Sequence, residues 1–171
     1  MMRAIPCLMV SDIASALPFY KEILGFVNVS KPDKSLANIC RTPSGKPMLQ
    51  GAEEGVQLYL RTPYPPPQPQ DPPFPPMSVH VEVANVDDMF DEIYYRAQRT
   101  HPSEDDYFPA FQFGKARIHG RPQNTSFGTR EIRINDADAN LLVFFQDIRA
   151  APQASNSNIV RGPVERKVKR R

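Results

Sequence analysis

The sequence predicts an α+β fold in which two modules, each ordered βαβββ, follow one another along the chain. Short runs of strand length surround two segments whose apolar residues recur at helical spacing. The pattern VSDIASA at residues 10–16 recurs as VANVDDM at 83–89, an offset of 73 residues that indicates an internal duplication. A hairpin follows, because residues 129–134 alternate in character, 136–140 supplies turn formers and 141–145 is a short apolar run. Such a hairpin is not stable alone in water, so it must complete a sheet that the rest of the chain supplies.

The helix of the first module contains a proline, which limits where the helix can begin. Either Asp12 or Ser15 can supply the N-terminal cap. With Ser15 as the cap, Pro18 falls in the first turn and is tolerated, whereas in the helix interior it would cost about 3 kcal/mol. Gly25 is expected to end the helix. Its apolar positions are Ala16, Leu17, Tyr20, Ile23 and Leu24.

The strands of the first module are expected on both sides of this helix. Residues 5–10 precede it, and the runs 26–30, 36–41 and 56–61 follow it with polar or glycine-containing turns between them. The first module therefore spans residues 1–62.

A proline-rich connector at residues 63–76 separates the two modules. Its sequence, PYPPPQPQDPPFPP, lacks most of the backbone donors that a helix or sheet interior requires. The chain has 19 prolines, about twice the usual share of about 5%, and they are concentrated here. A stiff, extended connector is the expected role, and a docking motif for a proline-reading domain is the alternative.

The second module, residues 77–148, begins with a clear half-buried strand. Its valines at 79, 81 and 83 alternate with Ser78, His80 and Glu82. Asn85 or Asp87 can cap the helix that follows, which continues to about residue 99. Residues 101–125 form a long, irregular connection with one strand expected near 110–113. The helix carries one apolar face, made of Met89, Phe90, Ile93 and Ala97.

Charge and composition limit the partners of the chain. Residues 161–171 carry six Lys and Arg against one Glu, whereas residues 1–160 carry 15 basic and 18 acidic side chains. We expect residues 149–171 to be a disordered basic tail, and binding of nucleic acid, an anionic surface or an import receptor is the alternative. No apolar run approaches the ~20 residues that cross a bilayer, and no export signal is evident. A cytoplasmic protein is therefore expected, with nuclear entry through the tail as the alternative.

Several chemical motifs are absent from the sequence. It has no nucleophile elbow with a Ser–His–Asp order, no glycine-rich phosphate loop and no paired cysteine motif. Cys7 and Cys40 are expected to be reduced, buried thiols. Arg130 and Glu131 are expected to form a structural ion pair across the hairpin. His101 and His119 fall in the irregular connection, where no site role is expected for them.

Three stretches resemble the vicinal oxygen chelate superfamily of glyoxalases, bleomycin-resistance proteins and extradiol dioxygenases. They are VSDIASALPFYKEILGF at 10–26, VEVANVDDMFDEI at 81–93 and FGTREIRINDADANLLVFF at 127–145. The resemblance implies that each module curls into a half-barrel, giving a curved, incomplete barrel whose concave face holds a ligand. Family members usually have DPDGN where this chain has DADAN, so Ala137 and Ala139 replace the proline and glycine of the turn.

The resemblance also implies where a metal would lie, and the residues there are poor ligands. Its metal positions fall on Ile5, Ser78, Val143 and either Gln57 or Tyr59. A divalent cation needs nitrogen or oxygen donors at about 2.0–2.2 Å, which isoleucine and valine lack. We therefore expect no cofactor, and a divalent metal relocated to His80, Glu82 and Gln57 is the alternative.

These features most resemble the bleomycin-resistance branch, whose members bind a small organic molecule. We expect a ligand-binding homodimer with shared pockets, without catalysis, which binds an aromatic or cationic molecule and could confer antibiotic tolerance. The alternatives are a lyase, isomerase or dioxygenase of the same superfamily, metal-free acid–base chemistry with Glu82 as the base, or an interaction module. Nucleic acid and membrane are not expected partners. The predicted pocket consists of Cys7, Met9, Tyr59, Ser78, His80, Glu82, Phe111, Phe113 and Phe145.

Overall fold

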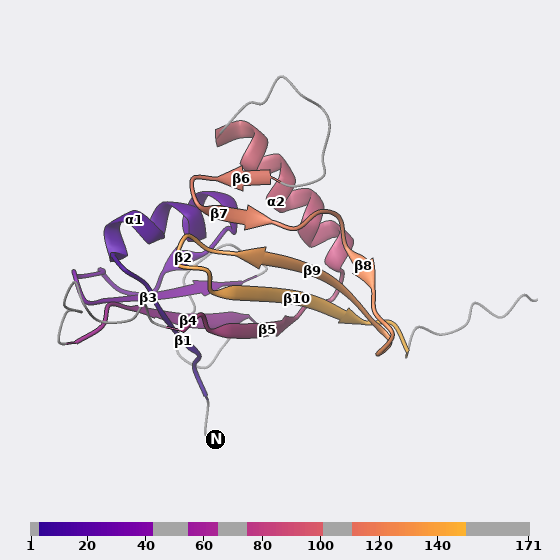
Figure 1. Ribbon diagram of the computed structural model, residues 1–171, viewed down its shortest axis with the longest axis horizontal. Helices are drawn as coiled ribbons and strands as arrows, with labels where there is room; N and C mark the ends of the chain where they lie inside the picture. The colour runs from indigo at the N-terminus through magenta and orange to yellow at the C-terminus, as the bar shows by residue number, and fades with distance from the viewer. Residues whose placement is uncertain (1–3, 43–54, 65–74, 101–110, 150–171) are drawn as a thin grey trace, which may run out of the picture.

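The computed structural model describes residues 4–42, 55–64, 75–100 and 111–149, which form two β-sheets with helices on one side (Figure 1). Each sheet begins with a strand that pairs in parallel with a later strand of the same module, and its other pairings are antiparallel. Neither sheet closes into a barrel within the described residues. The α+β fold with two related modules is thus confirmed.

The first sheet has the order β1-β4-β3-β2. Its strands are Cys7–Met9 (β1), Val27–Asn28 (β2), Leu36–Arg41 (β3) and Val56–Arg61 (β4). The expected bounds of β3 and β4 are confirmed, whereas β1 and β2 are shorter than the runs that predicted them.

The second sheet has the order β5-β10-β9-β7-β6, and β8 pairs with β9 beside this path. The connection expected to be irregular contains three short strands in its described part, and residues 101–110 lie outside the described residues. These strands are held by pairing with each other and with β9, which local patterning does not reveal. The strands are Ser78–Glu82 (β5), Phe111–Phe113 (β6), Ala116–Ile118 (β7), Gln123–Asn124 (β8), Thr129–Asn135 (β9) and Leu141–Asp147 (β10).

The first helix starts earlier than the Ser15 cap would require. It is an α-helix at Ile13–Pro18 (α1), and it continues as one π-helical segment at Phe19–Ile23 (η1). Asp12 is the cap, and its carboxylate accepts hydrogen bonds from the backbone N–H and hydroxyl of Ser15, at 2.7 and 2.6 Å. Pro18 therefore lies at the end of α1 rather than in its first turn. The wider winding that follows is typical of a proline that interrupts the regular hydrogen-bond ladder.

The second helix, Val86–Thr100 (α2), follows its predicted pattern closely. Asn85 caps it, because its side-chain oxygen accepts from the backbone N–H groups of Asp87 and Asp88. The predicted apolar face of Met89, Phe90, Ile93 and Ala97 is buried. Arg130 does not pair with Glu131 as expected. Neighbouring strand residues point to opposite faces, and Arg130 instead binds both carboxylate oxygens of Asp87 on α2 at 2.8 Å.

One continuous apolar core lies between the helices and the two sheets. It joins Leu8, Ile39 and Leu58 of the first sheet to Ile132 and Phe144 of the second. Helix α2 also packs against η1, so each module covers part of the other. Because the modules share one core, the relative position of their sheets is fixed by packing.

The turn between β9 and β10 fastens the two modules together. The buried carboxylate of Asp136 accepts hydrogen bonds from the hydroxyl of Tyr20 at 2.7 Å and from the side-chain amide of Asn140 at 2.8 Å. The same amide donates to the backbone oxygen of Met9 at 2.8 Å. Burial raises the pKa of the Asp136 carboxyl, although Asn140 and Tyr20 donate hydrogen bonds to it.

Candidate functional site

The second sheet has two faces of different character, and the candidate site lies on the one turned away from the helices. Strand alternation directs Val79, Val81, Ile132, Leu142 and Phe144 toward the core. The residues between them point to the opposite side, which we call the open face. Ser78, His80 and Glu82 of β5 are exposed there.

The strand register arranges the open face in three rows, each with an apolar residue between two polar ones. In each row, β10 contributes the central residue, and β5 and β9 contribute the two ends. Adjacent strands lie about 4.8 Å apart and successive rows about 6.8 Å apart. The rows are Ser78–Leu141–Asn135, His80–Val143–Arg133 and Glu82–Phe145–Glu131.

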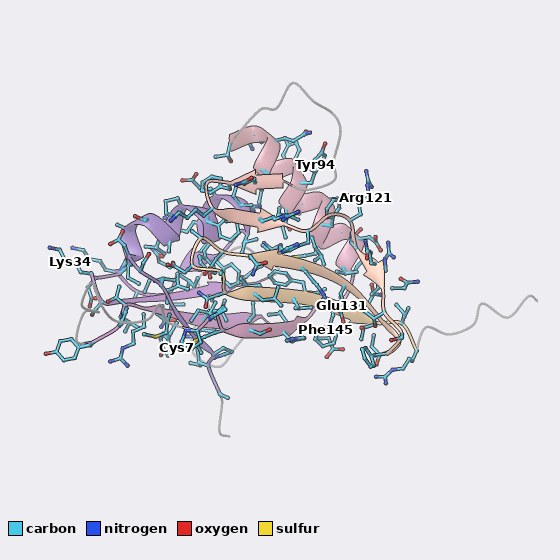
Figure 2. The ribbon with its side chains drawn as sticks, viewed as in Figure 1. Cys7, Lys34, Tyr94, Arg121, Glu131 and Phe145 are labelled. Carbon is cyan, nitrogen blue, oxygen red and sulfur yellow. The ribbon has the colours of Figure 1, made fainter. Side chains whose placement is uncertain are left out.

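Two of these rows carry opposite charge. The row of Glu82, Phe145 and Glu131, here named the acidic row, places an aromatic ring between two carboxylates. Figure 2 shows Phe145 and Glu131 near each other on neighbouring strands. The adjacent row ends in His80 and Arg133, and we name it the basic row.

Among the described residues, a pocket of about 530 Å³ lies between the first sheet and β5, and it is larger than a second pocket over β8 and β9. It brings His80 and Glu82 from the predicted set together with Gln57 of β4. Arg41 also lines it, although its guanidinium donates to the Leu24 carbonyl and forms an ion pair with Glu92 at 2.6 Å. The apolar part of the wall is formed by Pro6, Val56, Val79, Val81, Val83 and Phe144.

The other predicted site residues lie outside this pocket. Cys7, Met9 and Tyr59 are half-buried, and Cys7 pairs with Tyr59 in the first sheet. Figure 2 labels Cys7. Ser78 and Phe145 lie on the open face of the second sheet. Contact of these five residues with a ligand stays a prediction.

Two predicted phenylalanines belong to β6. Phe113 packs into the core, 6.0 Å from the ring of Phe19, and so faces away from the open side. The Phe111 backbone pairs with Ile118, and its side chain lies outside the described residues.

A smaller pocket of about 280 Å³ contains side chains for which the sequence predicted no binding role, His119 among them. It lies over β8 and β9 and includes His119, Arg133, Glu131 and Gln123. Alternation along 129–135 places Glu131 and Arg133 on one face, so that pattern was the available signal. Their relation to His119 depends on long-range pairing, which the sequence does not show.

Cys7 and Cys40 form no disulfide within the described residues. Cys40 is buried as expected, and Cys7 is half-buried.

The residues at the family's metal positions do not fit a metal. Ile5 and Val143 have no lone pair to donate, and Val143 is only 1% exposed. The amide nitrogen of Gln57 donates a hydrogen bond to the side-chain oxygen of Asn38 at 2.7 Å. The side-chain oxygen of Gln57 is then its one atom that could bind a metal. Among the described residues, no three His, Cys, Asp or Glu side chains are grouped closely enough to hold an ion. The donor chemistry at these positions therefore does not favour a resident metal.

The chain belongs to the glyoxalase/bleomycin resistance protein/dioxygenase superfamily, because the family's sequence model matches residues 4–144. No curated protein sequence matches it significantly.

Solved structures show the same fold at low sequence identity. The bleomycin resistance determinant encoded on transposon Tn5 is 21% identical, with 86% of this chain and 98% of that chain covered and a TM-score of 0.54. The bleomycin-binding protein of Streptomyces verticillus, complexed with copper(II)-bleomycin, is 17% identical, with 84% and 94% covered and a TM-score of 0.54. A glyoxalase-related enzyme from Clostridium phytofermentans is 14% identical, with 86% and 96% covered and a TM-score of 0.55.

The described helices are too short or too polar to cross a membrane.

Proposed function

We propose that this protein binds a small aromatic, cationic molecule on the open face of the second sheet, without a metal and without catalysing a reaction. The observation that carries the proposal is the acidic row. Phe145 offers an aromatic surface, and the carboxylates of Glu82 and Glu131 lie on the two strands beside it.

This arrangement suits a cation for two physical reasons. The face of an aromatic ring attracts a cation with about 0.5–2 kcal/mol, depending on how far the site is desolvated. The two carboxylates on the strands that flank β10 add Coulomb attraction, and Glu131 is sheltered, with its side chain only 13% exposed. Organic ligands bind to apolar surfaces with a few converging polar groups, and the three rows of the open face have this character.

The shared fold is consistent with this role. Two structural neighbours are bleomycin-binding or bleomycin-resistance proteins, so the fold can serve to bind an organic molecule. We extend this to a homodimer in which a second copy covers the open face and completes a shared pocket. Binding of a toxic cation in this way would give antibiotic tolerance.

Calorimetric titration of the full chain with benzylamine, benzyl alcohol and benzoate tests the proposal. Benzylamine should bind most tightly, because it alone combines a ring with a cation. Phe145→Ala should weaken its binding at least about 10-fold, and Glu82→Gln about 3- to 10-fold, which correspond to about 0.7–1.4 kcal/mol or more. Phe127→Ala is the matched control, because this phenylalanine is 80% exposed on the loop before β9 and lies outside the three rows.

Failure of all three compounds to bind a folded dimer would contradict the proposal, as would equal binding by the wild type and Phe145→Ala. Light scattering in the same samples tests the dimer, for which a monomer at all concentrations is the opposing result.

A metal-dependent enzyme is the second candidate, because Gln57, His80 and Glu82 all line the larger pocket. Metal analysis of protein purified without a histidine tag distinguishes the two functions. A stoichiometric divalent ion that is lost in His80→Ala would favour the enzyme, and metal-free protein that still binds benzylamine would favour the binding protein.

A further inference from the structure

We infer that the ligand carries an oxyanion as well as a cation, and that Arg133 binds this oxyanion. The inference rests on the proposed function, because it places the cation at the acidic row. It adds a site for a negatively charged group of the same ligand, so the expected ligand is a zwitterion.

Arg133 is positioned to bind an anion. Its side chain is 61% exposed, it points to the open face, and it lines the smaller pocket of about 280 Å³. Among the described residues it makes one ion pair, in which a terminal nitrogen lies 3.4 Å from Glu131 Oε2. A guanidinium has five N–H donors in a planar fork that matches a carboxylate or phosphate, so most of its donors remain for a ligand.

Neighbouring arginines are engaged on the other side of the sheet. Arg130 binds Asp87 through two nitrogens, both at 2.8 Å. The Arg121 guanidinium lies 5.7 Å from the centre of the Phe90 ring of α2. Figure 2 shows Arg121 beside α2. Arg121 also lines the smaller pocket, but its guanidinium is engaged with this ring, whereas Arg133 is free to offer most of its donors there.

His119 is held beside Arg133 by two contacts. Its backbone N–H donates to the carbonyl of Arg133 at 2.9 Å, and its ring Nε2 lies 2.5 Å from Asn135 Oδ1. Because the Asn135 amide nitrogen donates to the Ala139 carbonyl at 3.0 Å, its oxygen must face the histidine. Nε2 therefore carries a proton, and in the tautomer with no second proton Nδ1 is an acceptor. Such an acceptor would favour an oxyanion that also carries a hydroxyl, such as a singly protonated phosphonate or phosphate.

The register fixes how far apart the two charges of the ligand should be. Phe145 lies on β10 opposite Glu131 of β9, and Arg133 lies two residues further along β9. The Cα atoms of Phe145 and Arg133 are therefore separated by about 8 Å. A cation over Phe145 and an oxyanion at Arg133 therefore suit the two ends of one para-substituted benzene ring.

Four probes titrated into the full chain test this inference: benzylamine, benzoate, 4-(aminomethyl)benzoate and 4-(aminomethyl)phenylphosphonate. At least one of the two zwitterions should bind about 10-fold more tightly than benzylamine, as expected for a charge-assisted hydrogen-bonded pair. Arg133→Gln should remove this advantage. Because Arg133 also pairs with Glu131 of the acidic row, benzylamine binding should stay the same or tighten slightly, and the affinity of each zwitterion is therefore compared with that of benzylamine in the same variant. Arg117→Gln is the matched control, because Arg117 is exposed on β7 of the same sheet, lies outside the acidic and basic rows, and should leave all affinities unchanged.

The outcomes separate the inference from the proposed function. Zwitterions that bind no better than benzylamine, or an advantage that survives in Arg133→Gln, would overturn the inference while the cation site stands. If benzylamine itself does not bind the folded protein, the proposed function fails and the inference fails with it. Tighter binding of the phosphonate than of the carboxylate would support a role for His119 and identify a phosphorus oxyanion as the ligand class.

Discussion

Phe144 and Phe145 are neighbours in β10, yet they serve opposite faces of the second sheet. Phe144 is fully buried against the helices, whereas Phe145 is half-buried between Glu82 and Glu131 on the open face. Their difference arises from the strand period of two, which directs adjacent side chains to opposite sides. One face of the sheet therefore stabilises the fold, and the other is available for a ligand.

The two faces also differ in how much variation they can tolerate. The central part of the helix side is aliphatic and aromatic, as close packing in a core requires, and Arg130 beyond it binds Asp87 of α2. The open side alternates apolar and charged residues across the strands, which costs little only because water or a ligand can reach them. A polar residue on the first face would destabilise the protein, and an apolar residue on the second would mainly change what it binds.

The largest effect is expected from truncating the two phenylalanines separately. Phe144→Ala should lower the free energy of unfolding by about 3–5 kcal/mol, because it removes a large side chain from a packed core and leaves a cavity. Phe145→Ala should cost about 1 kcal/mol or less and instead weaken binding of benzylamine. Urea denaturation of both variants measures the difference.

Phe145→Leu serves as the control, since it keeps most of the apolar surface and loses the ring. Equal destabilisation by Phe144→Ala and Phe145→Ala would contradict the division of the sheet into a structural face and a binding face.

A smaller effect is expected at the turn that holds β9 and β10 in register. Asp136→Asn should lower the free energy of unfolding at neutral pH by about 1–3 kcal/mol. In the wild type, each carboxylate oxygen of Asp136 accepts two hydrogen bonds. Oδ2 accepts from the Tyr20 hydroxyl and the Asn140 side-chain amide, and Oδ1 accepts from the backbone N–H groups of Asp138 and Asn140. An asparagine at this position would turn the N–H groups of its side-chain amide toward two of these donors, and those hydrogen bonds would be lost. Thermal unfolding followed by circular dichroism measures the loss.

The pH dependence of this variant tests the environment of Asp136. Burial raises the pKa of this carboxyl above its ordinary value of 3.8, so the folded state binds its proton more tightly than the unfolded state. The part of the stability that depends on this proton is then fully present below pH 3.8 and is lost as the pH rises through the folded pKa, whereas the hydrogen bonds to the carboxylate remain at neutral pH. The difference in stability between the wild type and Asp136→Asn should therefore shrink as the pH rises through this range. A difference that grows with pH would show that the hydrogen bonds outweigh burial.

The elements of this fold were predictable wherever periodicity alone decides the structure. The alternation at residues 78–83 predicted β5, and the apolar face around Ile93 predicted α2. The cap of α1 was not predicted uniquely, because avoiding Pro18 favoured Ser15, while the structure accommodates the proline by π-helical winding after it. Strands β7 and β8 were missed because they contain three and two residues and depend on pairing with β9.

The site was predictable only where one strand sufficed. His80 and Glu82 follow from the alternation of β5, and the structure places both in the larger pocket. The acidic and basic rows require two registers. That of β5 with β10 sets residues 63 positions apart side by side, and that of β10 with β9 sets residues 10 to 14 positions apart side by side. No local pattern contains that information, so Arg133 and the contact between His119 and Asn135 became evident only in three dimensions.

The smallest effect on stability is expected at Ala139, in the turn between β9 and β10. This turn holds the two strands in the register that gives the sheet its two different faces. Ala139 has a φ of 64°, a left-handed conformation that costs a residue with a Cβ atom about 1–2 kcal/mol. Ala139→Gly relieves this strain but also gives the unfolded chain more freedom, so a net gain of about 0.5–1 kcal/mol is expected. Differential scanning calorimetry should show a rise in Tm of a few degrees with unchanged binding of benzylamine. Ala137→Gly is the control, and it should destabilise slightly because no positive φ is relieved there. An equal response of the two variants would show that backbone strain at Ala139 does not limit the stability of the turn.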